Sequence, residues 1–157
     1  MTLSESACRL RDLPNAGGNS VVSEVMSFEV LQKCFGAELL KTEMEVTYWP
    51  EGGSITDYMC NMFGTTLGVS VTRAMTFRGN FTEEEAQRLL SKKLNGIIQS
   101  SQNSLDNWNK QILHVWAASR PIAEIMAATF NSLPSFIRSN TLLLITVSNF
   151  KDIYYNR

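Results

Sequence analysis

An aspartate stands in the middle of a segment that otherwise has the pattern of a β-strand, Asp57 in Ser-Ile-Thr-Asp-Tyr-Met-Cys. A carboxylate within a sheet competes for backbone hydrogen bonds, and it needs a cation, a donor or water. The next apolar segment alternates, with Ser70 and Thr72 on one face and Arg73 on the other. Small polar groups beside Asp57 leave room for a functional site. The structural alternatives are an ion pair between Asp57 and Arg73, or a solvated aspartate at a strand end.

Other common catalytic motifs are absent from the sequence. There is one histidine, His114, which excludes sites built from several histidines and favours a buried histidine that holds a backbone group. No Gly-x-Ser-x-Gly, Walker or Gly-x-Gly-x-x-Gly pattern occurs. Three cysteines, an odd number without a Cys-x-x-Cys pair, argue against disulfides and a cysteine-rich zinc site. Reduced thiols predict a cytoplasmic or nuclear protein.

The charge balance places few limits on partners. Fourteen Lys and Arg residues against fifteen Asp and Glu residues give a net charge of −1. A domain that grips nucleic acid usually has a basic excess, so charge alone does not call for such a partner, although a protein or nucleic acid partner stays possible. No apolar stretch approaches the ~18 residues of a membrane span, and the N-terminal residues lack the apolar core of a secretory signal. We therefore expect no membrane partner.

Three helices are expected to position these residues. Apolar residues recur at three- and four-residue spacing over residues 20–35, a helix that carries Glu24 and Glu29. A glutamate on a helix is most often solvated, which is the structural alternative for both. Thr82 opens a capping box at the start of a second helix, and a third is expected over residues 121–133.

Five strands complete the predicted fold. Residues 39–49, 54–63 and 67–75 are separated by short turns, which predicts an antiparallel meander of three strands. Residues 110–117 and 140–147 are nearly continuous apolar runs, so both strands should lie inside the sheet. The order is α-β-β-β-α-β-α-β. It predicts an α/β domain with a mixed five-stranded sheet, parallel crossovers and flanking helices.

The domain organisation follows from length and local composition. The chain has 157 residues, a usual length for one domain. Residues 1–19 are polar and contain Pro14 and a Gly-Gly pair, which predicts a flexible N-terminal tail. Residues 20–157 are expected to form a single α/β domain.

The element order, together with Asp57, resembles the PD-(D/E)XK superfamily of restriction-endonuclease-like phosphodiesterases over residues 20–147. The resemblance implies that Glu24, or Glu29, and Asp57 hold Mg²⁺, and that Thr72 or Arg73 contacts the scissile phosphate. The third strand departs from the family pattern, because Ser-Val-Thr-Arg stands where the family has an acid and a lysine.

Three functions are compatible with this pattern. The leading hypothesis is a divergent restriction-endonuclease-like domain without catalysis that binds a protein or nucleic acid, since the acid and lysine of the third strand are missing. The alternative is a metal-dependent phosphodiesterase that uses Asp57 and Glu24 with Mg²⁺. The third is a protein-interaction domain without nuclease ancestry.

Overall fold

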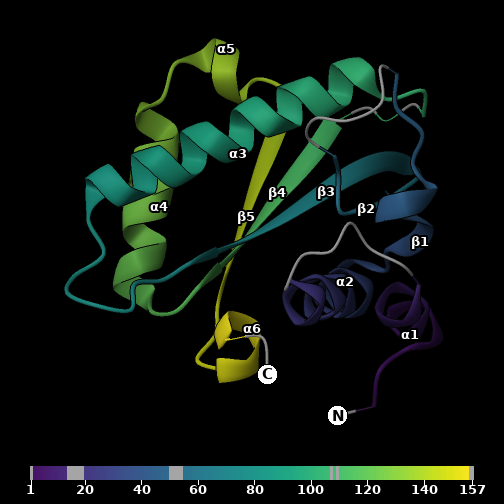
Figure 1. The fold of residues 1–157 in the computed structure, drawn as a ribbon, viewed down its shortest axis with the longest axis horizontal. Helices are drawn as coiled ribbons and strands as arrows, with labels where there is room; N and C mark the ends of the chain where they lie inside the picture. Colours follow the sequence, from purple (N-terminus) through teal and green to yellow (C-terminus); the bar gives the residue numbers. More distant parts are fainter. Residues whose placement is uncertain (1, 14–19, 50–54, 107, 109, 156–157) are drawn as a thin grey trace.

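A single sheet with helices on both faces forms the centre of the protein (Figure 1). The computed structural model describes residues 2–13, 20–49, 55–106, 108 and 110–155. The elements follow one another as α1 (Glu5–Asp12), α2 (Val21–Phe35), β1 (Glu38–Thr42), the 3₁₀ helix η1 (Glu43–Glu45), β2 (Tyr58–Met62), β3 (Thr65–Ala74), α3 (Glu83–Asn103), β4 (Lys110–Ala117), α4 (Arg120–Ser132), α5 (Ser135–Arg138), β5 (Thr141–Val147) and α6 (Lys151–Tyr155). None of the described helices is both long and apolar enough to span a bilayer.

The predicted sheet class is confirmed. The five strands lie in the order β1-β2-β3-β4-β5. The first three pair antiparallel, and β4 and β5 then add parallel to β3. A two-residue turn joins β2 to β3, with positive φ angles at Phe63 (54°) and Gly64 (74°). These values fit the turn whose twist matches a tight hairpin.

Two strand predictions are wrong in detail. The strand expected over residues 39–49 ends at Thr42, because Glu45 bends the chain into η1. Its carboxylate accepts hydrogen bonds from the Thr42 N–H and hydroxyl, both at 2.9 Å. The strand expected inside the sheet over 140–147 is instead the edge strand β5. The apolar residues of β5 pack against helices on the two faces of the sheet. An apolar run shows that both faces of a strand are covered, but it does not show whether the strand lies at the edge or in the centre of the sheet.

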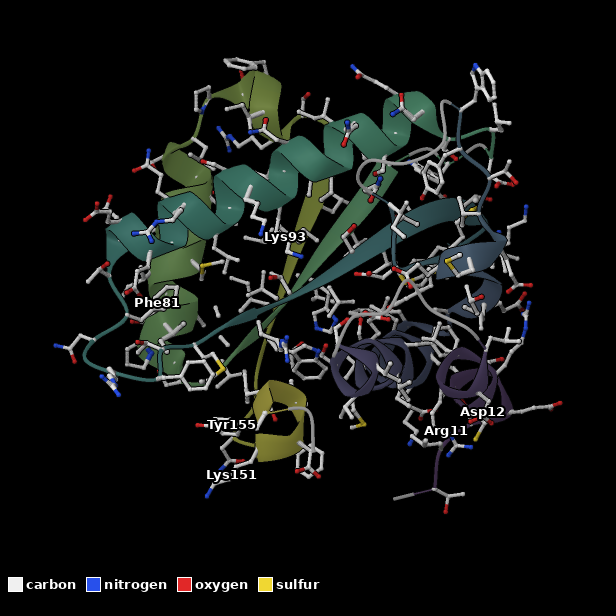
Figure 2. The ribbon with its side chains drawn as sticks, in the orientation of Figure 1. Arg11, Asp12, Phe81, Lys93, Lys151 and Tyr155 are labelled. Atoms are coloured by element: carbon white, nitrogen blue, oxygen red, sulfur yellow. The ribbon has the colours of Figure 1, made fainter. Side chains whose placement is uncertain are left out.

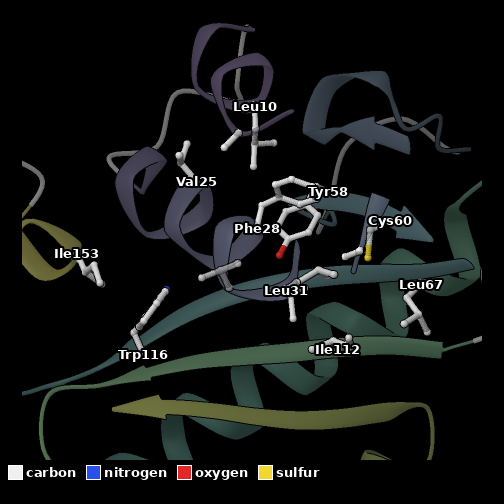
Figure 3. Packing of buried hydrophobic residues seen from close by; sticks show 14 of the residues in the cluster. Leu10, Val25, Phe28, Leu31, Tyr58, Cys60, Leu67, Ile112, Trp116 and Ile153 are labelled. Atoms are coloured by element: carbon white, nitrogen blue, oxygen red, sulfur yellow. The ribbon is translucent and has the colours of Figure 1, made fainter. Parts of the chain in front are cut away.

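The helices divide between the two faces of the sheet. On one face α2 and α6 enclose an apolar cluster with the sheet (Figure 3). On the other face α3 and α4 pack over a second cluster that includes Leu90, Leu113 and Met126. The predicted cap of α3 is present, since the Thr82 hydroxyl accepts the Glu85 N–H at 3.2 Å. The middle of the sheet is therefore covered on both sides, as we expected for β4.

The segment expected to be an N-terminal tail contains the helix α1. Ser4 caps this helix, and Ala7 and Leu10 are buried against the apolar cluster around α2. Glu29 of α2 accepts the Ser4 N–H at 2.7 Å. The apolar side of so short a helix amounts to a few residues, and its spacing did not stand out in the polar sequence. Pro14 and the Gly-Gly pair lie outside the described residues.

Candidate functional site

Asp57 lies at a step in the sheet, directly before β2. The pairing of β2 with β3 ends at Tyr58 and Val69, while β3 continues to Ala74 beside β4. The Asp57 N–H donates to the Val69 carbonyl at 2.9 Å, and its carboxylate accepts the Val71 N–H at 2.6 Å. The Asp57 side chain thus gives the Val71 N–H of β3 a hydrogen-bond acceptor at the point where β2 ends. This is why an aspartate is tolerated here, although the sequence placed it within a strand.

Glu24 of α2 provides a second carboxylate at this step. Its side chain is buried, with 7% of its surface exposed, and it accepts a hydrogen bond from the Ser20 hydroxyl. Burial raises the pKa of Glu24, and the charge of Glu43 raises it further. Burial and then the charge of Glu24 raise the pKa of Asp57 to about 8. The structure therefore brings the two predicted acids within electrostatic reach of each other.

The charge of Lys93 on α3 acts on the same two acids. Its side chain points from α3 toward the sheet in Figure 2, and its charge lowers the pKa of both Glu24 and Asp57. The sequence analysis did not select this lysine. The available signal was its position on the apolar stripe of the helix, three residues after Leu90 and four before Ile97, where a charge needs a partner. Lys92 beside it is exposed.

The two residues of β3 predicted to contact a phosphate have different surroundings. The Arg73 guanidinium donates to the Ile153 and Tyr154 carbonyls of α6, at 3.5 and 3.3 Å, and its charge lowers the pKa of Glu24. Thr72 is 6% exposed. Strand alternation places it on the face opposite Arg73. Of the two, only Arg73 carries a charge, and that charge acts on Glu24.

A buried glutamine, Gln111, binds the side chain of Thr56, the residue before Asp57. The Gln111 carbonyl accepts the hydroxyls of Thr56 at 2.9 Å and Ser70 at 3.3 Å. Its amide donates to two serine hydroxyls of α3, at 2.8 and 3.0 Å. A Cβ atom at Gly68 would lie 3.2 Å from the Thr56 hydroxyl oxygen, so the close packing of this network depends on glycine. Gln111 thereby ties the segment that carries Asp57 to β3 and α3.

Glu29, the other helix residue considered as a metal ligand, has a structural role. It is 1% exposed, binds the Ser4 N–H and lies 3.2 Å from the Lys33 ammonium. Burial alone would raise the pKa of Glu29, but the hydrogen bonds from Ser4 and Lys33 lower it. A carboxylate held in this way anchors α1 to α2.

His114 is buried in the core, as the sequence favoured. Its Nδ1 lies 2.6 Å from the Ser27 hydroxyl and its Nε2 lies 2.9 Å from the Thr146 hydroxyl. Both partners are side chains, where the sequence analysis expected a backbone group. Burial lowers the pKa of His114 to about 4, so the ring is neutral at physiological pH. The Ser27 hydroxyl also bonds the Tyr58 hydroxyl at 2.8 Å, which makes a buried polar chain across the sheet.

The donor set at the step suits one kind of metal ion. Within the described residues no group of three or more His, Cys, Asp or Glu side chains could hold a metal ion. Transition metals and Ca²⁺ usually take such larger sets of protein ligands. Mg²⁺ often uses one or two carboxylates, with water and substrate phosphate as its other ligands. Two carboxylates, Glu24 and Asp57, match the number of protein ligands that Mg²⁺ commonly uses, the remaining ligands coming from solvent or substrate.

Comparisons with known proteins identify one clear relative. No protein-family model matches the chain. The AAC-rich mRNA clone AAC4 protein of Dictyostelium discoideum is 45% identical over 151 residues, which cover 91% of this chain and 22% of that protein. The chain thus spans about a fifth of the length of this curated relative.

A search of solved structures finds SfsA of Pyrococcus furiosus in complex with Ca²⁺. The two share 13% sequence identity and superpose with a TM-score of 0.39 over 89% of this chain and 57% of that chain. At this TM-score we infer neither a shared fold nor a shared function.

Proposed function

We propose that this chain is a restriction-endonuclease-like domain that hydrolyses phosphodiester bonds with Mg²⁺ held by Glu24 and Asp57. The observation that carries the proposal is that the charges of Glu24, Asp57 and Lys93 act on one another near the step where β2 ends beside β3. Carboxylates with raised pKa values beside a lysine are costly to keep in a fold. Such groups are concentrated at functional sites.

The arrangement of elements supports the same proposal. The chain runs from α2 through the meander β1–β3 and over α3 to β4, the order on which the resemblance to the PD-(D/E)XK superfamily rests. Glu24 comes from the helix before the meander and Asp57 from the start of its second strand. These are the positions at which that superfamily carries acids.

The missing lysine of the third strand has a candidate replacement. The charge of Lys93 acts on the carboxylates from α3 rather than from β3. In the proposed reaction, Glu24 and Asp57 would hold Mg²⁺, which would supply Lewis-acid activation of the phosphate and of a water molecule. Lys93 and Arg73 would bind the phosphate oxygens and stabilise the charge that develops on them. We assign this contact to Arg73 rather than Thr72, because Arg73 carries a positive charge that acts on Glu24 and Thr72 carries none.

A binding domain without catalysis is the second candidate. The observation that favours it is Ser70 and Thr72 on β3, where the superfamily carries an acid and a lysine. In that case Glu24 and Asp57 would be remnants of a site, and the scaffold would serve to bind a protein or nucleic acid. The two candidates differ in whether a divalent metal binds and whether a phosphodiester is cut.

Cleavage of fluorescently labelled single-stranded DNA, duplex DNA and RNA, in Mg²⁺, in Mn²⁺ and in EDTA, tests the proposal. We expect metal-dependent cleavage that falls by about 100-fold or more in Asp57→Asn, Glu24→Gln and Lys93→Met. Lys92→Met is the matched control and should cut like the parent, because Lys92 is exposed. Equal cleavage in Asp57→Asn would mean a contaminating nuclease and would contradict the assignment.

Calorimetric titration with Mn²⁺ separates the two candidates. Saturable binding that is lost in Asp57→Asn, together with cleavage, supports the phosphodiesterase. Binding of Mn²⁺ or of nucleic acid without any cleavage supports the non-catalytic domain. Neither binding nor cleavage would reject Glu24 and Asp57 as a metal site.

A further inference from the structure

The two edges of the sheet differ sharply in how they are protected. The β1 edge is short, carries Glu38 and Lys41, and has an irregular register between Leu39 and Lys41. Charges, short length and bulges are the usual means by which an edge strand avoids pairing with another chain. The β5 edge has none of these features, since β5 pairs with β4 in unbroken register.

The β5 edge is also apolar on both sides of the sheet. From Ser139 to Phe150 the sequence contains no charged residue. Leu142 is 49% exposed and Val147 is 50% exposed, one near each end of the strand. Pairing with another β-strand would satisfy the outer backbone groups of β5 and cover these side chains.

The two ends of β5 carry complementary features. The short helix α5 lies just before the strand, and its Phe136 is 75% exposed. Beside the far end of the strand, a groove of about 600 Å³ is lined by Ala123 and Ala127 of α4 with Ile145 and Val147 of β5, and also by the charged side chains Arg120 and Glu124 of α4. An exposed aromatic side chain therefore lies at one end, and a groove with an apolar floor and the Arg120 and Glu124 side chains beside it lies at the other.

We propose that β5 is a dimer interface, on which the β5 strand of a second copy pairs antiparallel. Antiparallel pairing centred on Leu144 brings the start of one strand beside the end of the other. Both α5 and α4 pack against α3, so they lie on the same side of the sheet. A twofold axis perpendicular to the sheet places the α5 and α4 helices of both copies on the same side of the joined sheet. The partner's Phe136 then lies beside the groove at Val147.

The self-complementarity of the edge is what selects a second copy as the occupant. In the twofold arrangement the Phe136 of each copy lies beside the groove of the other copy, once at each end of the paired strands. Parallel pairing of the same two edges would need a twofold axis along the strand, which places the two α5 helices on opposite sides of the joined sheet and leaves both grooves without a Phe136. The uncharged strand also pairs with itself without bringing like charges together.

The mass of the protein in solution, measured by light scattering and sedimentation at several concentrations, tests the proposal. We expect a dimer whose dissociation constant rises by about tenfold or more in Leu142→Lys and in Phe136→Ala. Two matched controls should leave the dimer unchanged. Leu40→Lys lies on the β1 edge at 40% exposure, and Phe77→Ala removes an aromatic ring that is 76% exposed. Circular dichroism verifies that each variant is folded.

Disulfide trapping tests the orientation of the strands. In a Cys8→Ser and Cys34→Ser background, chains with Thr141→Cys mixed with chains with Val147→Cys should form a mixed disulfide on mild oxidation. Each variant alone should cross-link far less, because antiparallel pairing separates identical positions near the strand ends. A monomer at all concentrations, or a dimer that Leu142→Lys leaves intact, would overturn the proposal. Self-linking of Val147→Cys would overturn the antiparallel arrangement.

Discussion

The carboxylate of Asp57 accepts the backbone N–H of Val71 at 2.6 Å, at the first stretch of β3 that β2 leaves unpaired. This bond gives Asp57 a structural partner, yet burial and Glu24 raise the pKa of the same group to about 8. One hydrogen bond does not compensate for the loss of solvation and for a neighbouring negative charge. The raised pKa means that ionisation of Asp57 lowers the stability of the folded state.

The first prediction concerns the dependence of stability on pH above neutrality. The raised pKa of Asp57 means that its contribution is fully present below about pH 4 and is lost as the pH rises through about 8. At pH 8.5, without metal, Asp57→Asn should raise the free energy of unfolding by about 1 kcal/mol or more. Urea melts from pH 6.5 to 8.5 in EDTA measure this. A variant less stable than the parent at pH 8.5 would show that the carboxylate is purely structural.

A second prediction concerns acid. The pKa of His114 is lowered to about 4, so the folded state binds fewer protons than the unfolded state. The stability it contributes is present above the ordinary histidine pKa of about 6.5 and is lost as the pH falls toward 4. The raised pKa of Asp57 makes stability increase as the pH falls over the same range, which would mask the effect of His114. The Asp57→Asn variant is therefore the better starting protein for this test. In that background, denaturant melts should show stability falling from pH 6.5 to 4.5, and His114→Gln should flatten the fall.

Much of the fold could be predicted because periodicity and capping are local signals. Thr82 caps α3 as expected, and β4 matches residues 110–117. The misses depend on non-local contacts. The edge position of β5 depends on which strands pair, and the burial of α1 depends on Glu29, 25 residues from Ser4.

The candidate site was predictable in part. Asp57 stood out because aspartate is unusual within a strand pattern, and Glu24 followed from the resemblance. Lys93 was missed because it lies on a helix that packs on the opposite face of the sheet from α2. The charge of Lys93 acts on Glu24 near the part of β3 that has no β2 neighbour. The sequence did not reveal this gap, because the strand β2 was predicted to begin at residue 54 and begins at Tyr58.

The third prediction tests the cap of α3. Thr82→Ala removes the hydroxyl that accepts the Glu85 N–H and should lower the free energy of unfolding by about 0.5–2 kcal/mol. Ser119→Ala, at the start of α4, should cost less, because its hydrogen bond to the Ile122 N–H is longer at 3.4 Å. Denaturant melts of the three proteins give the comparison. An unchanged midpoint for Thr82→Ala would mean that the cap contributes nothing to stability.

The last prediction concerns the packing beside Asp57. Gly68→Ala would place a Cβ atom 3.2 Å from the Thr56 hydroxyl oxygen and 3.3 Å from the Gln111 side chain. Both neighbours are buried and hydrogen-bonded, so they have little room to move, and we expect a loss of about 1–3 kcal/mol in the free energy of unfolding. Thr56→Ala removes the crowded oxygen, and Gly68→Ala should cost less in that background than in the parent.

This double-mutant cycle isolates the contact, because each single change also alters the network around Gln111. Urea melts of the parent, both single variants and the double variant give the coupling energy. If the effects of the two changes simply add, the contact between position 68 and Thr56 is not what excludes a larger side chain. If they couple as expected, Gly68 is required because Thr56 and Gln111 must pack against β3 to hold the segment that carries Asp57.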